Sequence, residues 1–358
     1  MQDLRRFAVA RSLFPPTSLK RAIEKLGFIQ ADPIRAPARA QDLTLRHRVA
    51  GYRAGDLERL YARLEIEEDV FVNYGFVTKS LHALMHPRAG RSRWATARRS
   101  KLHELLEFVR DRGIVHPREV DAHFSRGTVT NYWGGSSSAT THLLDDMHYR
   151  GVLRVVRREG GIRLYSARDR AIGPMDVATR RAQVDALVDS VVRLYAPLPA
   201  ASLSGLVSRL RYAVPQWRRE LKAALQRARN RLAHARVEGL DWFWPAGERV
   251  TSGSSPDALR LLAPFDPVVW DRRRFEIFWQ WAYRFEAYTP PRKRKFGYYA
   301  LPLLYRDRVI GWGNVSITNG DLQADLGFVE VSPPRGPAFK RALEAELDRL
   351  RHFLGVEH

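Results

Sequence analysis

Cysteine is absent from the 358-residue chain, and its absence excludes several kinds of chemistry. Without thiols there are no disulfides, no thiolate-bound zinc or iron–sulfur clusters, and no cysteine nucleophile. Long apolar runs are also missing, because none approaches the ~18 residues that a membrane-spanning helix needs. The first residues, MQDLRRFAVARSLFPP, lack a continuous apolar core followed by a cleavage site. We therefore expect a soluble, cytoplasmic protein with no membrane partner.

Sequence motifs for cofactor binding and nucleophilic catalysis are equally scarce. The chain has no P-loop, no dinucleotide fingerprint and no nucleophile elbow, and we expect no cofactor. His82 and His86 have the i, i+4 spacing that puts two imidazoles on one helix face. No acid follows the first histidine and the sequence places no third ligand nearby, so solvated or capping histidines are favoured over a metal site.

An acidic run, EIEED, contains Glu65, Glu67, Glu68 and Asp69. Carboxylates of this kind hold the metal ions of metal-dependent nucleases. Matching carboxylates at strand ends are missing elsewhere, so we interpret the run as a solvated turn and keep the nuclease as a weaker alternative.

Positive charge is the most prominent property of the composition. Lys and Arg number 60 against 39 Asp and Glu, which gives a net charge of +21 spread along the chain. A folded protein this basic usually binds a polyanion, most often nucleic acid. A membrane surface is less favoured because neither terminus forms a basic amphipathic helix, and an Arg-rich background composition is the neutral alternative.

Basic residues and aromatics occur together at 87–103 (PRAGRSRWATARRSKLH), 270–274 (WDRRR) and 290–299 (PPRKRKFGYY). Basic side chains contact phosphates and aromatic rings stack on bases, so these segments predict DNA contact. With the basic residues after the first strand and one tryptophan, the predicted DNA-binding set is Arg39, Arg46, His47, Arg48, Arg91, Arg93, Arg98, Arg99, Trp133, Arg272, Arg273, Arg274, Arg292, Lys293, Arg294 and Lys295.

The periodicity predicts an α+β fold that is mainly α. Residues 101–165 read as three helices followed by a hairpin, the order of a winged helix. The same order recurs after residue 173, and the first hundred residues form a plausible third copy. From about residue 261 the chain is rich in aromatic and β-branched residues, typical of a small antiparallel β domain, and 337–354 reads as a terminal helix. We therefore predict three tandem winged-helix units, 1–100, 101–172 and 173–258, and a C-terminal β-rich domain, 259–358.

The stretch LGFIQADP places Gln30 and Asp32 two positions apart at the end of an apolar strand. Residues at i and i+2 point to the same face of a strand. Structurally, Asp32 suits an Asx turn before Pro33, and Gln30 suits an edge strand. Chemically, an amide can hold a water molecule, while a carboxylate accepts its proton and stabilises a nearby positive charge. A glycosidic carbon with oxocarbenium character is a suitable target. Both interpretations remain open on spacing alone.

Three stretches together resemble the AlkZ/YcaQ family of winged-helix DNA glycosylases. They are LGFIQADPIRAPARAQDLTLRHR, YWGGSSSATTHLLDDMHYRGVLRVVRREGGIRLY and LLAPFDPVVWDRRR with the following YTPPRKRKFGYYALPLL. The resemblance runs over nearly the whole chain in the expected order. It implies three tandem winged-helix units, a β-rich C-terminal domain, and excision of N7-alkylated purines with unhooking of interstrand crosslinks.

Gln30-Ala31-Asp32 matches the Gln-x-Asp motif of the YcaQ-like branch. The resemblance implies that Gln30 positions a water molecule and that Asp32 is a general base or an electrostatic stabiliser. It also implies a monofunctional, metal-independent glycosylase that leaves an abasic site in double-stranded DNA. Gln41 stands where many members have histidine, so no role is carried over to it.

Two other functions remain alternatives: a non-catalytic winged-helix DNA-binding regulator and, more weakly, the metal-dependent nuclease. A simple repressor would not need the Gln30/Asp32 pair, and chelation would separate the nuclease from a glycosylase. We expect a monomer that is cytoplasmic and associates with the nucleoid when it acts on DNA.

Overall fold

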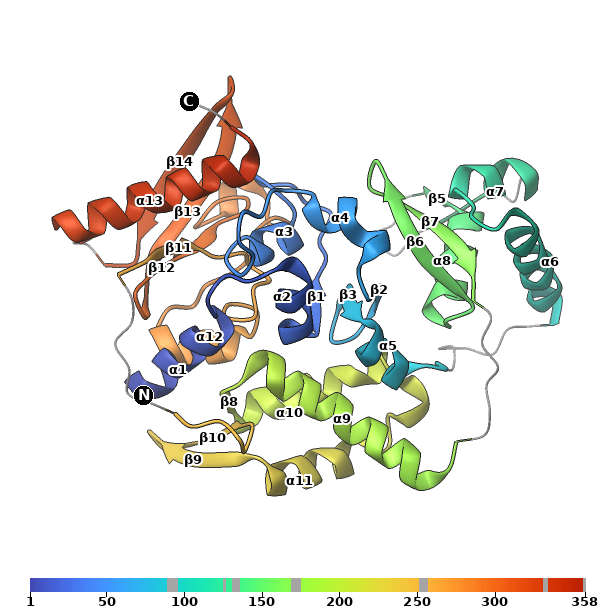
Figure 1. The fold of residues 1–358 in the computed structure, drawn as a ribbon, viewed down its shortest axis with the longest axis horizontal. Helices are drawn as coiled ribbons and strands as arrows, with labels where there is room; N and C mark the ends of the chain where they lie inside the picture. The colour runs from blue at the N-terminus through green and yellow to red at the C-terminus, as the bar shows by residue number, and fades with distance from the viewer. Residues whose placement is uncertain are drawn as a thin grey trace. The chain divides into compact units, whose positions relative to one another are not determined.

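The computed structural model describes residues 1–88, 96–124, 127–130, 136–168, 175–250, 257–330 and 334–356. The chain divides into two compact units (Figure 1). Unit 1 consists of Met1–Leu57, Val188–Val207 and Leu225–His358, and unit 2 consists of Glu58–Leu187 and Ser208–Ala224. Each unit is described separately below.

Unit 1 begins with α1 (Gln2–Ser12), α2 (Leu19–Leu26), the short strand β1 (Phe28–Gln30) and α3 (Ala40–Leu45). Ser18 caps α2 by accepting a hydrogen bond from the Arg21 N–H, and Gly27 ends it with φ of 70°. Strand β1 follows Gly27 directly. Its three residues are buried, and Gln30 is the last of them.

The C-terminal part of unit 1 is an antiparallel sheet in the order β11-β12-β13-β14. Its strands are Leu259–Leu261, Leu301–Tyr305, Arg308–Thr318 and Asp321–Phe328. Helix α12 (Arg272–Trp279) lies between the first two strands in sequence, and α13 (Pro337–Leu354) closes the chain against β11 (Figure 1). The predicted antiparallel C-terminal sheet and terminal helix are therefore confirmed.

Unit 2 contains the hairpin β2 (Ile66–Val70) and β3 (Tyr74–Thr78), followed by α5 (Lys79–Met85). It continues with α6 (Thr96–Arg112), α7 (Pro117–Phe124), β4 (Thr128–Thr130), β5 (Ser136–Ser138) and α8 (Ala139–Tyr149). Strands β6 (Leu153–Glu159) and β7 (Ile162–Ala167) then form a hairpin. Leu105, Val109, Leu144 and Val155 are among the fully buried residues that hold these helices on the hairpin.

The remaining elements are α4 (Asp56–Leu60), α9 (Val177–Tyr195), β8 (Leu198–Pro199), α10 (Ala200–Arg209), α11 (Leu221–Arg231), β9 (Ala233–Val237) and β10 (Leu240–Trp244). Short 3-10 helices cover Tyr61–Arg63, Leu210–Tyr212, Pro215–Trp217 and Pro291–Lys293. The β9–β10 hairpin turns at Glu238 and Gly239, both with positive φ.

The mixed α and β composition agrees with the predicted fold class, while the three winged-helix units and their boundaries stay predictions. None of the helices described is both long enough and apolar enough to span a bilayer.

Candidate active site

Gln30 is the last residue of β1 and is buried, with 6% of its surface exposed. Its side-chain oxygen Oε1 accepts a hydrogen bond of 2.5 Å from the indole Nε1 of Trp270. The indole packs against the ring of Tyr195, with centroids 5.5 Å apart. Because an indole N–H only donates, it orients the amide with the oxygen toward Trp270 and leaves the amide nitrogen as a donor on the other side.

Asp32 follows in a half-buried turn. Its Oδ1 accepts a 2.9 Å hydrogen bond from the backbone N–H of Ile34, which is the predicted Asx turn around Pro33. Its own backbone N–H donates over 3.4 Å to Oε1 of Gln41, which α3 holds in the core with 2% exposure. The turn and the chemical interpretation are compatible, since the turn engages one carboxylate oxygen.

Burial raises the pKa of Asp32, and the Ile34 N–H only partly opposes that shift. The pKa values of Tyr288 and Tyr299 are also raised, first by burial and next by the negative charge of Asp32. The carboxylate is therefore a stronger base than an ordinary aspartate, and two phenol groups lie within range of its charge.

A cavity of about 570 Å³ lies beside this turn, within unit 1. Arg35, Ala36 and Pro37 line one side, directly after the Asx turn. Tyr298, Tyr299 and residues of β13 and β14 line the other. Its size suits a small-molecule ligand or a single nucleotide component.

Three consecutive members of the predicted DNA-binding set are tied into the interior of unit 1. Arg48 is fully buried and makes two contacts of 2.7 and 2.9 Å with Asp266. Arg46 pairs with the buried Glu346 at 2.5 Å. His47 contacts a backbone carbonyl at 2.9 Å, and burial keeps its pKa well below the ordinary value. DNA contact by these three residues is wrong as a prediction, because buried side chains with internal partners leave no surface for a phosphate.

Residues 272–274, which begin α12, differ in how far their side chains are buried. Arg274 is buried and donates to the backbone carbonyls of Tyr195 and Pro267, so its predicted DNA contact is also wrong. Arg272 is half-buried over the ring of Tyr283, 4.5 Å from its centroid, and donates to two backbone carbonyls. Arg273 is exposed and stays a candidate.

The segment 290–295 presents three exposed basic side chains of the predicted set in unit 1. Arg292, Lys293 and Lys295 are exposed, and Arg294 is half-buried over the ring of Tyr298. Arg39 is half-buried. Of the other predicted residues, Arg91, Arg93 and Trp133 lie outside the described residues, as do the side chains of Arg98 and Arg99 on α6.

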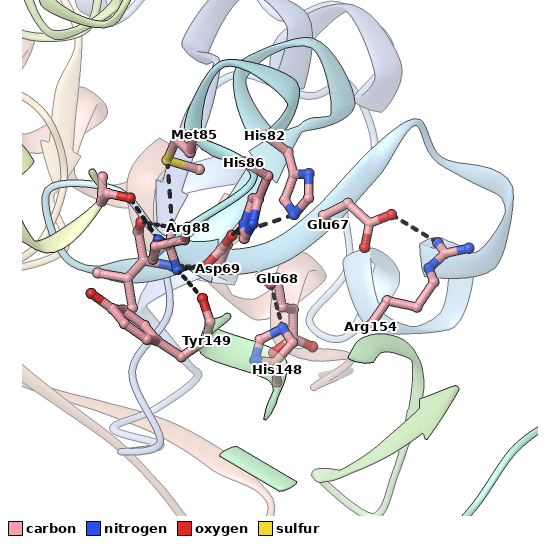
Figure 2. A network of polar contacts seen from close by, with 12 residues as sticks. Glu67, Glu68, Asp69, His82, Met85, His86, Arg88, His148, Tyr149 and Arg154 are labelled. Atoms are coloured by element: carbon pink, nitrogen blue, oxygen red, sulfur yellow. Dashed lines mark hydrogen bonds and ion pairs between the residues drawn. The ribbon is translucent and has the colours of Figure 1, made fainter. Parts of the chain in front are cut away.

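Unit 2 contains a second polar cluster, formed by the acidic run on β2 (Figure 2). The expected solvated turn is wrong for Glu67, Glu68 and Asp69, which are 3% exposed or less. Each carboxylate has arginine partners: Arg154 and Arg168 at 3.0 Å from Glu67, Arg158 at 2.6 Å from Glu68, and Arg88 at 2.7 Å from Asp69. Glu65 alone of the run is exposed, and it pairs with Lys79.

Asp69 also supplies the third potential metal ligand that sequence spacing did not reveal. Its Oδ2 lies 2.6 Å from Nε2 of His86 and 3.4 Å from Nε2 of His82, and the rings of the two histidines stack at 4.2 Å. Burial and the neighbouring histidine lower the pKa of His82 to about 2, so its imidazole is neutral. The buried guanidinium of Arg88 already compensates Asp69 and would repel a dication placed here. This cluster has the properties of an internal ion-pair network, not of a metal centre or nuclease site.

A basic protein that holds an oriented amide two positions from a half-buried carboxylate has features expected of a DNA glycosylase. Residues 23–353 match the AlkZ-like DNA glycosylases, and the chain belongs to that family. The matched range contains Gln30, Asp32, Gln41 and Trp270.

The fold is similar to that of the DNA glycosylase AlkZ of Streptomyces sahachiroi, with a TM-score of 0.65 and 15% sequence identity. The alignment covers 99% of this chain and 96% of the other.

Sequence reasoning missed the contact of Trp270 with Gln30 and the position of Tyr299 in the cavity wall. Trp270 lies 240 positions from Gln30, and no local pattern connects them. In the sequence, Trp270 indicated only that an aromatic residue lies next to a basic segment.

Proposed function

We propose that this DNA glycosylase hydrolyses the N-glycosidic bond of N7-alkylguanine in double-stranded DNA and unhooks interstrand crosslinks formed through that atom. The observation that supports this most directly is the pairing of an oriented amide with a half-buried carboxylate. Gln30 is held by Trp270, and Asp32 is held by its Asx turn, so both groups are positioned before DNA binds.

Alkylation at N7 makes the guanine cationic, so the bond electrons pass to a base that leaves neutral. The sugar carbon gains oxocarbenium character, which the negative charge of Asp32 stabilises. The Gln30 amide nitrogen donates a hydrogen bond to the oxygen of the attacking water. As that oxygen bonds to the sugar carbon, Asp32 accepts the water proton, and an abasic site remains.

This chemistry needs neither a general acid nor a Lewis acid, because the leaving group already carries the positive charge. A monofunctional, metal-independent enzyme is therefore sufficient, and it uses no lysine nucleophile. DNA is the partner, and the exposed side chains of Arg292, Lys293 and Lys295 are suitable phosphate contacts. A monomer suffices for this reaction, since the proposed catalytic groups come from one chain.

The test uses purified protein and duplexes that contain N7-methylguanine or a nitrogen-mustard crosslink, with EDTA present. We expect base release that survives EDTA and is largely lost in Gln30→Ala and Asp32→Asn, with DNA binding retained. The exposed Asp257, which pairs with Arg306, provides a matched control: Asp257→Asn should keep full activity. Wild-type protein that binds both duplexes but releases no base would overturn the proposal and favour a binding protein.

A further inference from the structure

Tyr299 has a buried hydroxyl without a hydrogen-bond partner among the residues that the structure describes. The residue precedes β12 and is 3% exposed. Buried hydroxyls are nearly always hydrogen-bonded, since leaving one unpaired is unfavourable. Nearby Tyr283 follows this rule by donating to the carbonyl of Ala300 at 2.7 Å. The Tyr299 hydroxyl therefore has no protein acceptor among the described residues and keeps its proton available for donation.

The position of Tyr299 indicates what that partner is. It lines the same cavity as Arg35, Ala36 and Pro37, the segment that leaves the Asx turn. The ionisable groups whose charges act on it are Asp32, Tyr283, Tyr288 and Tyr298. Among these groups Asp32 carries the carboxylate, which is the strongest hydrogen-bond acceptor.

One carboxylate oxygen of Asp32 can accept a further hydrogen bond. Oδ1 accepts from the Ile34 N–H, while Oδ2 has no hydrogen bond to any residue that is described. Tyr288 also lies within range of the Asp32 charge, but its side chain is exposed to solvent, whereas Tyr299 is buried. Hydrogen bonds of catalytic groups are often incomplete in free enzymes and form in the complex with substrate.

We propose that Tyr299 is a positioning residue: when substrate DNA is bound, its hydroxyl donates a hydrogen bond to Oδ2 of Asp32. The bond fixes the direction of the carboxylate and stabilises its ionised form, while a second lone pair of Oδ2 stays directed at the attacking water. This inference rests on the proposed function, because it assigns Tyr299 a role in the same reaction.

The experiment compares Tyr299→Phe with Tyr283→Phe in single-turnover release of N7-methylguanine from duplex DNA across pH. For Tyr299→Phe we expect release to slow by about tenfold to a hundredfold, as for loss of a hydrogen bond to a charged group, with DNA affinity unchanged. The acid limb of its pH–rate profile should move to higher pH, and its melting temperature should not fall. Tyr283→Phe removes a satisfied hydrogen bond, so its melting temperature should fall while its acid limb stays in place.

A rate within twofold of wild type and an unmoved acid limb in Tyr299→Phe would overturn the inference and leave the proposed function standing. If wild-type protein releases no base, the proposed function fails instead. In that case a carbon-13 NMR titration of Asp32 in the DNA-bound protein still decides: a higher Asp32 pKa in Tyr299→Phe supports the hydrogen bond, and an unchanged pKa refutes it.

Discussion

Replacing Trp270 with phenylalanine tests whether the orientation of Gln30 matters for base release. The change keeps an aromatic ring against Tyr195 but removes the N–H that donates to Oε1 of Gln30. An unpaired, buried amide oxygen costs about 1–3 kcal/mol, part of which is relieved if the amide rotates. That rotation turns the amide nitrogen away from the attacking water. We expect the activation free energy of base release to rise by about 1.4 kcal/mol, which slows release roughly tenfold.

The measurement is single-turnover release of N7-methylguanine at saturating protein, with DNA affinity followed by fluorescence anisotropy. Trp279→Phe is the matched control, because Trp279 also donates its indole N–H, to the backbone oxygen of Asp307 at 2.9 Å. Both variants should lose stability, but only Trp270→Phe should lose rate. A folded Trp270→Phe protein with the wild-type rate would refute the orienting role of the indole.

Three further predictions concern Asp32, Arg48 and Lys293 of unit 1. Base release should decrease as the pH falls through the pKa of Asp32, which burial raises, so the acid limb of the pH–rate profile should lie above the ordinary aspartate pKa of about 3.9. Asp32→Asn should remove most of the activity without lowering the melting temperature at neutral pH, since burial already disfavours the charged form. Arg48→Met leaves the buried Asp266 unpaired and should lower the free energy of unfolding by about 3–5 kcal/mol in urea titrations, and an unchanged value would contradict the structural role. Lys293→Ala should reduce the slope of log affinity against log salt by about one while sparing the rate at saturation, whereas an unchanged slope would remove Lys293 from the DNA interface.

Elements with local signals could be predicted from the sequence. Helix α2 begins at a serine cap and ends at a glycine, and the β9–β10 hairpin turns at Glu238 and Gly239. These residues act through neighbours a few positions away, so a short window contains the relevant physics. The antiparallel C-terminal domain was predictable for a related reason, because its aromatic and β-branched strands are separated by turn residues.

The environment of charged side chains could not be predicted in the same way. A run such as 46–48 has the same letters whether it faces a phosphate or a buried carboxylate 218 positions away, as Arg48 does with Asp266. The acids on β2 look like a solvated turn until their arginine partners, which lie elsewhere in the sequence, are placed. The candidate site shows the same division: the spacing of Gln30 and Asp32 was visible, whereas Trp270 enters only through tertiary packing.

The ion pairs of β2 are buried, so salt should affect the folding of unit 2 much less than it affects DNA binding. Pairs such as Glu68 with Arg158 are shielded from the solvent, and mobile ions screen buried pairs much less than exposed ones. Contacts between surface arginines or lysines and phosphates weaken steeply as salt rises. A buried Glu–Arg pair is already cancelled in the formal net charge of +21, so these pairs do not reduce the charge that DNA encounters. Concentrated salt should release this protein from DNA while unit 2 remains folded, so that a salt titration reports on the interface alone.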